Sequence, residues 1–136
     1  MEREDKELLL KDLCARLPFN PLVEYNGEKY NVLGIAHGRL VLCKPFMSYT
    51  LNENPLVEEV KPYLFPLSSM SEEQKREYNK WKHEIPVCRY EYGDVVEEIE
   101  LWDSPESFEY LIANHFDYRG LIPMGLANDA TGLNVY

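Results

Sequence analysis

The sequence predicts an α+β protein with a small antiparallel sheet, of about five strands in two hairpin clusters, and about three helices. Two turn signals, Asn26-Gly27 and Gly93-Asp94, each lie between apolar stretches of strand length. Two serines, Ser71 and Ser104, stand where helices are expected to begin. Strands that cluster around short turns, with helices between the clusters, are typical of this class. A length of 136 residues predicts a single domain over residues 1–136.

The first element is predicted to be a helix over residues 3–17, because Pro18 stops it. Its apolar residues fall at positions i, i+3, i+4 and i+7, which is the spacing of one helix face. We therefore expect one stripe to face the core: Leu10, Leu13, Cys14 and Leu17.

Three antiparallel strands are expected next, over residues 22–25, 29–36 and 39–43. Asn26-Gly27 joins the first two, because both residues tolerate the positive φ of a tight hairpin turn. His37-Gly38 offers a second turn of the same kind.

Residues 44–70 contain four prolines, which prevent long regular elements, and residues 61–67 are expected to be extended. Ser71 with Gln74 three residues on matches a capping box, which predicts a surface helix from Ser71 to about Lys82.

A second hairpin is expected from residues 87–92 and 95–102. The period of two puts Val95, Ile99 and Leu101 on one face and Val96, Glu98, Glu100 and Trp102 on the other. The last helix is predicted to start at Ser104 as N-cap, with Pro105 at its first position. Its inward stripe would be Phe108, Leu111, Ile112 and His115.

The formal net charge is −10, and it is unevenly distributed. Residues 1–68 carry 8 basic and 10 acidic side chains, whereas residues 69–136 carry 6 basic and 14 acidic ones. An acidic surface repels nucleic-acid phosphates and anionic membranes. We therefore expect no direct binding to nucleic acid or membrane, and a protein partner, for which a basic surface is one option. The charged start and the lack of a long apolar stretch favour a cytoplasmic protein.

The densest group of polar and aromatic side chains follows the last helix: His115, Asp117, Tyr118 and Arg119. Such residues can supply an acid or base, an orienting carboxylate and an anion clamp. They can equally hold a turn and cap the core, so this segment is a candidate binding segment with no catalytic residue assigned. Tyr78 and Trp81, on an otherwise polar helix, form a candidate interface, or they lean onto the preceding segment.

No pattern predicts a metal site or a cofactor, because the three histidines and three cysteines are widely spaced. The cysteines are expected to be reduced and packed as small apolar side chains. Residues 90–118 contain nine carboxylates and no Lys or Arg. Such a row can be a solvated face, or it can imitate duplex phosphates and inhibit a basic nucleic-acid-binding protein.

Two motifs, over residues 61–73 and 114–127, resemble a group of small uncharacterised proteins of gut Bacteroidales and of their phages and mobile elements. Residues 8–17 also look like the usual opening of that group. The resemblance implies a bacterial cytoplasm and a possible prophage setting, and it implies no activity.

The leading functional expectation is a non-enzymatic protein-binding or accessory module. The alternatives are a small enzyme or ligand-binding protein that uses residues 115–119, and an acidic nucleic-acid mimic.

Overall fold

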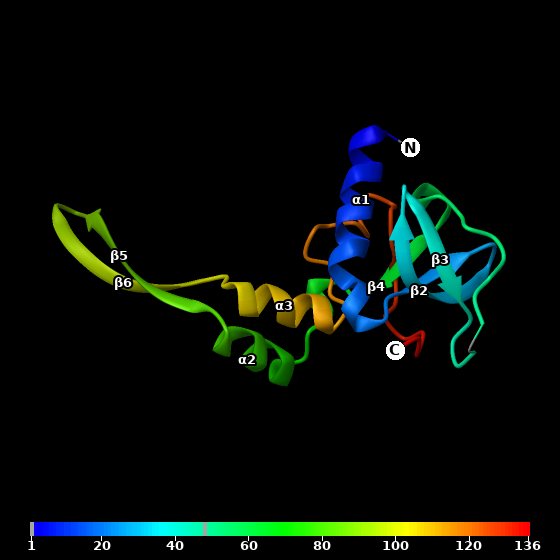
Figure 1. Cartoon of the computed structure of the whole chain (residues 1–136). Coiled ribbons are helices and arrows are strands. Elements are labelled where there is room, and N and C mark those ends of the chain that lie inside the picture. Colours follow the sequence, from blue (N-terminus) through cyan, green and yellow to red (C-terminus); the bar gives the residue numbers. More distant parts are fainter. Residues whose placement is uncertain (1, 48) are drawn as a thin grey trace. The chain divides into compact units, whose positions relative to one another are not determined.

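The structure is a computed structural model that describes residues 2–47 and 49–136, and its α+β class is the predicted one (Figure 1). The described residues contain two compact units. Unit 1 holds the described residues up to Ser69 together with Ile112–Tyr136, and unit 2 is Met70–Leu111. That the whole chain acts as one domain stays a prediction.

Unit 1 is built on a five-stranded sheet, with strand order β3-β2-β1-β4-β7 among the described residues. Its strands are β1 (Leu22–Tyr25), β2 (Glu28–Ala36), β3 (Arg39–Cys43), β4 (Lys61–Leu64) and β7 (Asn128–Asp129). The three strands expected before residue 44 are confirmed. The sequence predicted an antiparallel sheet, but one pair of its strands, β4 and β7, is parallel. The second hairpin forms a separate two-stranded sheet.

The β1–β2 turn follows the chemistry of its two residues. Asn26 and Gly27 have φ values of 49° and 78°, and both lie in the left-handed region that this type of tight turn requires. The turn fixes the register, in which Leu22 lies opposite Asn31 and Val23 opposite Tyr30. Val23 and Tyr30 are buried, so that face of the sheet belongs to the core.

Helix α1 (Arg3–Arg16) covers this core face (Figure 1). Its buried stripe differs from the predicted one: Leu10 and Leu17 are half-buried and Cys14 is exposed. The buried residues are Leu9, Asp12, Leu13 and Arg16, which have the same helical spacing one position earlier. Leu13 is buried as predicted and Leu10 and Leu17 pack against the core, but the prediction was wrong for Cys14. It missed Asp12 and Arg16 because it sought only apolar side chains, and half of the buried stripe is an ion pair.

Three short 3-10 helices, η1 (Leu17–Phe19), η2 (Val57–Glu59) and η3 (Leu67–Ser69), connect the elements of unit 1. The core lies between α1 and the sheet and is closed by Val57, Val60, Leu121 and Leu126. Residues 61–64, expected to be extended, form β4 and occupy an inner position of the sheet.

Unit 2 contains α2 (Glu72–Lys80), β5 (His83–Glu91), β6 (Asp94–Trp102) and most of α3 (Pro105–Ala113). The predicted capping box of α2 is confirmed, since Ser71 and Gln74 bond reciprocally. The predicted second hairpin is confirmed, but β5 begins earlier than predicted. Pro86 is tolerated inside it because a two-stranded sheet leaves one side of each strand unpaired. The turn residues are Tyr92-Gly93, one position before the predicted pair.

Helix α3 starts as expected, because the Ser104 hydroxyl accepts from the backbone N–H of Ser107 at 3.1 Å. The helix ends at Ala113, so the prediction that His115 continues its stripe was wrong. His115 has a φ of 62° and lies beyond the helix. No helix in the described part of the chain is both long and apolar enough to span a bilayer.

Candidate functional site

The segment from His115 to Arg119 is attached to unit 1 through its backbone. The amide of Phe65 donates to the carbonyl of His115 at 2.8 Å, and the amide of Asp117 donates to the carbonyl of Phe65 at 2.8 Å. These two bonds form a parallel bridge between Phe65 and Phe116. The segment therefore pairs with the backbone directly after strand β4.

Arg16 and Asp12 connect this segment to α1. Arg16 donates from Nε to Asp12 at 2.8 Å and from Nη2 to the carbonyl oxygen of Phe116 at 2.7 Å. Arg119 pairs with the same carboxylate, with an N–O distance of 3.3 Å. The side chains of Asp12 and Arg16 have no exposed surface. Such a pair is sensitive to the loss of either partner, which would leave an uncompensated buried charge.

Tyr118 and Asp117 also have structural partners. The Tyr118 ring centroid lies 4.6 Å from the Arg119 guanidinium carbon and 5.9 Å from that of Arg16, so the ring faces two cations. The buried Asp117 carboxylate accepts from the backbone N–H groups of Leu121 and Ile122, at 2.8 and 2.9 Å. It satisfies two amides that begin the following turn.

His115 stacks on the ring of Tyr136, with centroids 3.5 Å apart and an interplanar angle of 10°. Burial, and secondarily the positive charge of Arg16, lower the pKa of His115 from 6.5 to about 4. The imidazole is therefore neutral at pH 7. A base with so low a pKa is poorly matched to proton transfer near neutral pH.

The four candidate side chains thus fall into three separate groups of contacts. His115 contacts Tyr136, Asp117 caps a turn, and Tyr118 and Arg119 belong to the network around Asp12. None of the four lines the unit 1 cavity described below. The geometry accounts for this segment as a tie between α1, β4 and residues 121–122.

Tyr78 and Trp81 differ from each other. The Tyr78 hydroxyl donates to Asp103, and its ring lies 6.2 Å from that of Tyr110 and 4.4 Å from the Lys82 ammonium. Desolvation, followed by Asp103, raises the pKa of Tyr78. Tyr78 thus joins elements within unit 2. Trp81 is half exposed, and its role in an interface stays a prediction.

The feature that sequence reasoning did not single out is one face of the β5–β6 hairpin. Directly opposite residues in an antiparallel pair project to the same side. The register therefore gathers six side chains on one side, here called the apolar face: Pro86, Cys88, Tyr90, Val95, Ile99 and Leu101. All six are exposed, including 84% of Tyr90 and 69% of Ile99. The predicted common face of Val95, Ile99 and Leu101 is confirmed. The alternation in residues 86–90 is the sequence pattern that could have placed Pro86, Cys88 and Tyr90 on the same face.

The opposite face of the hairpin is more polar. Arg89 forms an ion pair with Glu98, and the indole N–H of Trp102 donates to Glu100 at 3.3 Å. Residues 83–102 carry six carboxylates and one arginine, a formal charge of −5. Glu84 and Glu97 lie on the side of the apolar face and the other four on the opposite side. The hairpin is an acidic element with one apolar face.

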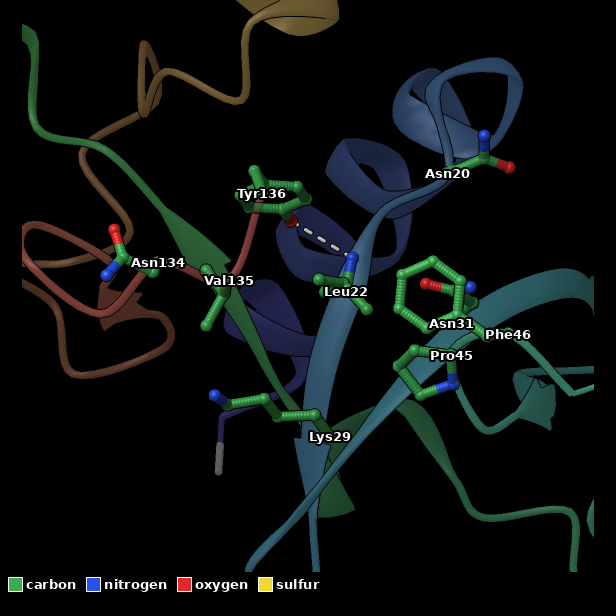
Figure 2. A pocket seen from close by; sticks show the side chains of 9 residues that line it. All are labelled: Asn20, Leu22, Lys29, Asn31, Pro45, Phe46, Asn134, Val135 and Tyr136. Carbon is green, nitrogen blue, oxygen red and sulfur yellow. Dashed lines mark hydrogen bonds between the residues drawn. The ribbon is translucent and has the colours of Figure 1, made fainter.

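Unit 1 contains a cavity of about 440 Å³. It lies on the sheet face opposite α1, between residues 45–46 on one side and 134–136 on the other (Figure 2). The residues that line it are Asn20, Leu22, Lys29, Asn31, Pro45, Phe46, Asn134, Val135 and Tyr136. The Tyr136 hydroxyl accepts from the Leu22 amide at 3.0 Å and donates to the Tyr63 carbonyl at 2.9 Å, which fixes one wall.

Within residues 2–47 and 49–136, no three His, Cys, Asp or Glu side chains are grouped so that they could hold a metal ion. Of the cysteines, Cys43 is buried as expected, whereas Cys14 and Cys88 are exposed, contrary to the prediction that all three are packed.

Comparison with known proteins gives no match to a protein-family model, to a curated protein or to a solved structure. The fold by itself defines the class of the protein. It is an α+β chain with one unit built on a five-stranded sheet and a second unit that carries the β5–β6 hairpin.

Proposed function

We propose that this protein is a non-enzymatic binding module that recognises a protein partner through the apolar face of the β5–β6 hairpin. The observation that carries the proposal is the exposure of all six apolar-face side chains on a two-stranded sheet. The bacterial or phage setting implied by the sequence resemblance is part of the same proposal.

The hairpin has little to stabilise it alone. A two-stranded hairpin is at best marginally stable in water, because only one pair of strands is formed and no face is covered. Contiguous exposed apolar side chains mark interaction surfaces more often than ordinary protein surface. Tyr90, on the apolar face near the tip, adds an exposed aromatic side chain of the kind that dominates binding energies. A partner that covers the apolar face would supply the missing burial.

Charge selects the kind of partner. The hairpin carries a formal charge of −5, and a second copy would place another −5 against it. Like charges at an interface oppose association, whereas a basic rim would be attracted and would associate faster at low salt. We therefore assign the partner as a protein surface with an apolar strip between Lys or Arg side chains.

The two alternatives have weaker support. An enzyme using residues 115–119 requires convergent side chains, and His115, Asp117 and Arg119 each engage a different partner. A nucleic-acid mimic requires the nine carboxylates on one face. The hairpin register divides its carboxylates between two faces, and Asp117 is buried.

The test compares the same substitution on the two faces of one hairpin. Ile99 lies on the apolar face and Ile85 on the opposite face, and both are exposed isoleucines. A photo-crosslinking residue at position 99, with position 85 as the control, captures the partner from cells that express the protein. The purified partner is then titrated against wild type, Ile99→Ser and Ile85→Ser by calorimetry.

Ile99→Ser should weaken binding by about tenfold or more, because burial of an Ile contributes roughly 1.5–3 kcal/mol. Ile85→Ser should change the affinity by less than about threefold. Equal losses in the two variants, or no loss in either, would contradict the proposal. So would a dimer in sedimentation equilibrium that Ile99→Ser dissociates, since the occupant would then be a second copy.

A further inference from the structure

We propose that the cavity of unit 1 binds a nucleoside monophosphate, a function independent of the hairpin. The cavity has a volume of about 440 Å³, and its lining includes an exposed aromatic ring, three side-chain amides and one ammonium group. This volume falls in the usual range for small-molecule sites, roughly 300–1,000 Å³. The three kinds of group match the base, its polar edge and a phosphate.

Phe46 is the first observation. Its side chain is fully exposed at the cavity, beside Pro45 and Asn31 (Figure 2). Its backbone φ is 65°, in the left-handed region that a phenylalanine rarely adopts. Exposure of a large ring and a strained backbone both disfavour phenylalanine here on grounds of stability. A ring presented in this way is suited to stack on a planar base, an interaction worth about 1–3 kcal/mol.

The amides are the second observation. Asn20, Asn31 and Asn134 come from three separate parts of unit 1 and line the same cavity at separate places (Figure 2). An amide offers a donor and an acceptor together, which is the pattern needed to pair with the edge of a base such as adenine. Pro45 and Val135 supply the apolar walls between them. Such a lining, with few polar groups set among apolar ones, is typical of small-molecule sites.

Lys29 is the third observation, and it limits the ligand to a single phosphate. Among the described residues of the lining it is the one charged side chain, whereas neighbouring Glu28 pairs with Lys44. A lysine ammonium acts as a point charge for one phosphate group. A polynucleotide would bring many phosphates to a chain of net charge −10, which opposes its binding. A free mononucleotide brings only one.

The experiment titrates the protein with AMP, GMP, CMP and UMP at millimolar concentrations and follows backbone amide shifts by NMR. We expect at least one nucleotide to shift resonances of Asn20, Asn31 and Phe46 in a saturable way. The matching nucleoside and ribose 5-phosphate are then tested as the two halves of the ligand. Each half should bind at least about tenfold more weakly than the whole nucleotide. The proposal is overturned if the site binds ribose 5-phosphate as tightly as the nucleotide. It is also overturned if the site binds none of the four nucleotides.

Three variants connect the binding to the residues. Lys29→Gln should weaken binding of the nucleotide about tenfold and leave the nucleoside unchanged, whereas Lys61→Gln, on the same sheet but outside the cavity, should change neither. Phe46→Gly should weaken both about tenfold without lowering the melting temperature, because glycine accepts the positive φ. Unchanged affinity in both Lys29→Gln and Phe46→Gly would overturn the assignment. A loss of affinity together with a lowered melting temperature in Phe46→Gly would show that the ring is structural, and would also overturn it.

Discussion

The fully buried guanidinium of Arg16 donates a 2.7 Å hydrogen bond to the carbonyl oxygen of Phe116, one hundred positions later in the chain. Through this bond the first helix determines where the segment around residue 116 lies. The same guanidinium holds Asp12, and Asp12 in turn holds Arg119. The polar residues that sequence reasoning singled out as a binding segment are organised by this network.

Asp12→Asn should destabilise the protein by about 3–5 kcal/mol, because Arg16 would keep a buried charge without its counter-ion. Urea unfolding followed by circular dichroism measures the change. Glu4→Gln, on the exposed first turn of the same helix, is the control and should cost less than about 1 kcal/mol. Adding Arg16→Met to Asp12→Asn should cost less than the two single changes together, since the charges are coupled. Strict additivity would show that the pair is not coupled.

Asp117→Ala should lower stability by about 2–4 kcal/mol, because it leaves the amides of Leu121 and Ile122 without an acceptor. Asp117→Asn keeps one carbonyl oxygen and should cost about half as much. Thermal unfolding of both variants gives the comparison. If both variants unfold at the wild-type temperature, the carboxylate is not a structural cap.

Stability should fall as the pH is lowered from about 6.5 towards 4, and His115 should be responsible for part of this loss. The pKa of His115 is lowered to about 4 in the folded protein, so in this window the unfolded chain binds the proton and the folded chain does not. Each pKa unit corresponds to at most about 1.4 kcal/mol, and because His115 is only partly buried, solvent screening reduces the loss across the window to about 1–2 kcal/mol. His115→Phe keeps the stacking on Tyr136 and should remove this contribution. An unchanged pH dependence in that variant would contradict the burial of a neutral imidazole.

Amides of β5 and β6 should exchange with deuterium much faster than those of β1 and β2. The hairpin forms a sheet of two strands with an exposed apolar face, whereas β1 lies between two paired strands beneath α1. Mass-spectrometric hydrogen exchange on the free protein measures the difference. Equal protection of the two hairpins would mean that the β5–β6 face is already covered in the free protein, contrary to our account.

The local signals in the sequence predicted the local structure well. Asn26-Gly27 indicated the first turn because both residues tolerate a positive φ. Ser71 and Ser104 indicated two helix starts because each hydroxyl satisfies a neighbouring backbone N–H group. The parallel pairing of β4 with β7 could not be predicted this way. β7 has only two residues, Asn128–Asp129, which is too short for any alternation.

The polar groups of the core were predicted least well. Asp12 and Arg16 occupy buried positions on α1, and a search for apolar residues shifted the stripe by one position. His115 was assigned to a helix that ends at Ala113, because its positive φ leaves no mark in the pattern. The cavity draws its lining from residues 20, 22, 29, 31, 45–46 and 134–136, which only the folded sheet brings together. The apolar face was visible in part, as the alternation of Val95, Ile99 and Leu101.

The accessibility of Cys88 tests the central claim most directly. Cys88 lies within the apolar face, while Cys14, also exposed, lies on α1 and serves as the internal control. In the free protein both thiols should react readily with a maleimide. In the complex with its partner, the reaction of Cys88 should slow by at least about tenfold while that of Cys14 is unchanged, because a covered face excludes the reagent. Equal reactivity of Cys88 in the free protein and in the complex would contradict the assignment of the hairpin as the binding surface.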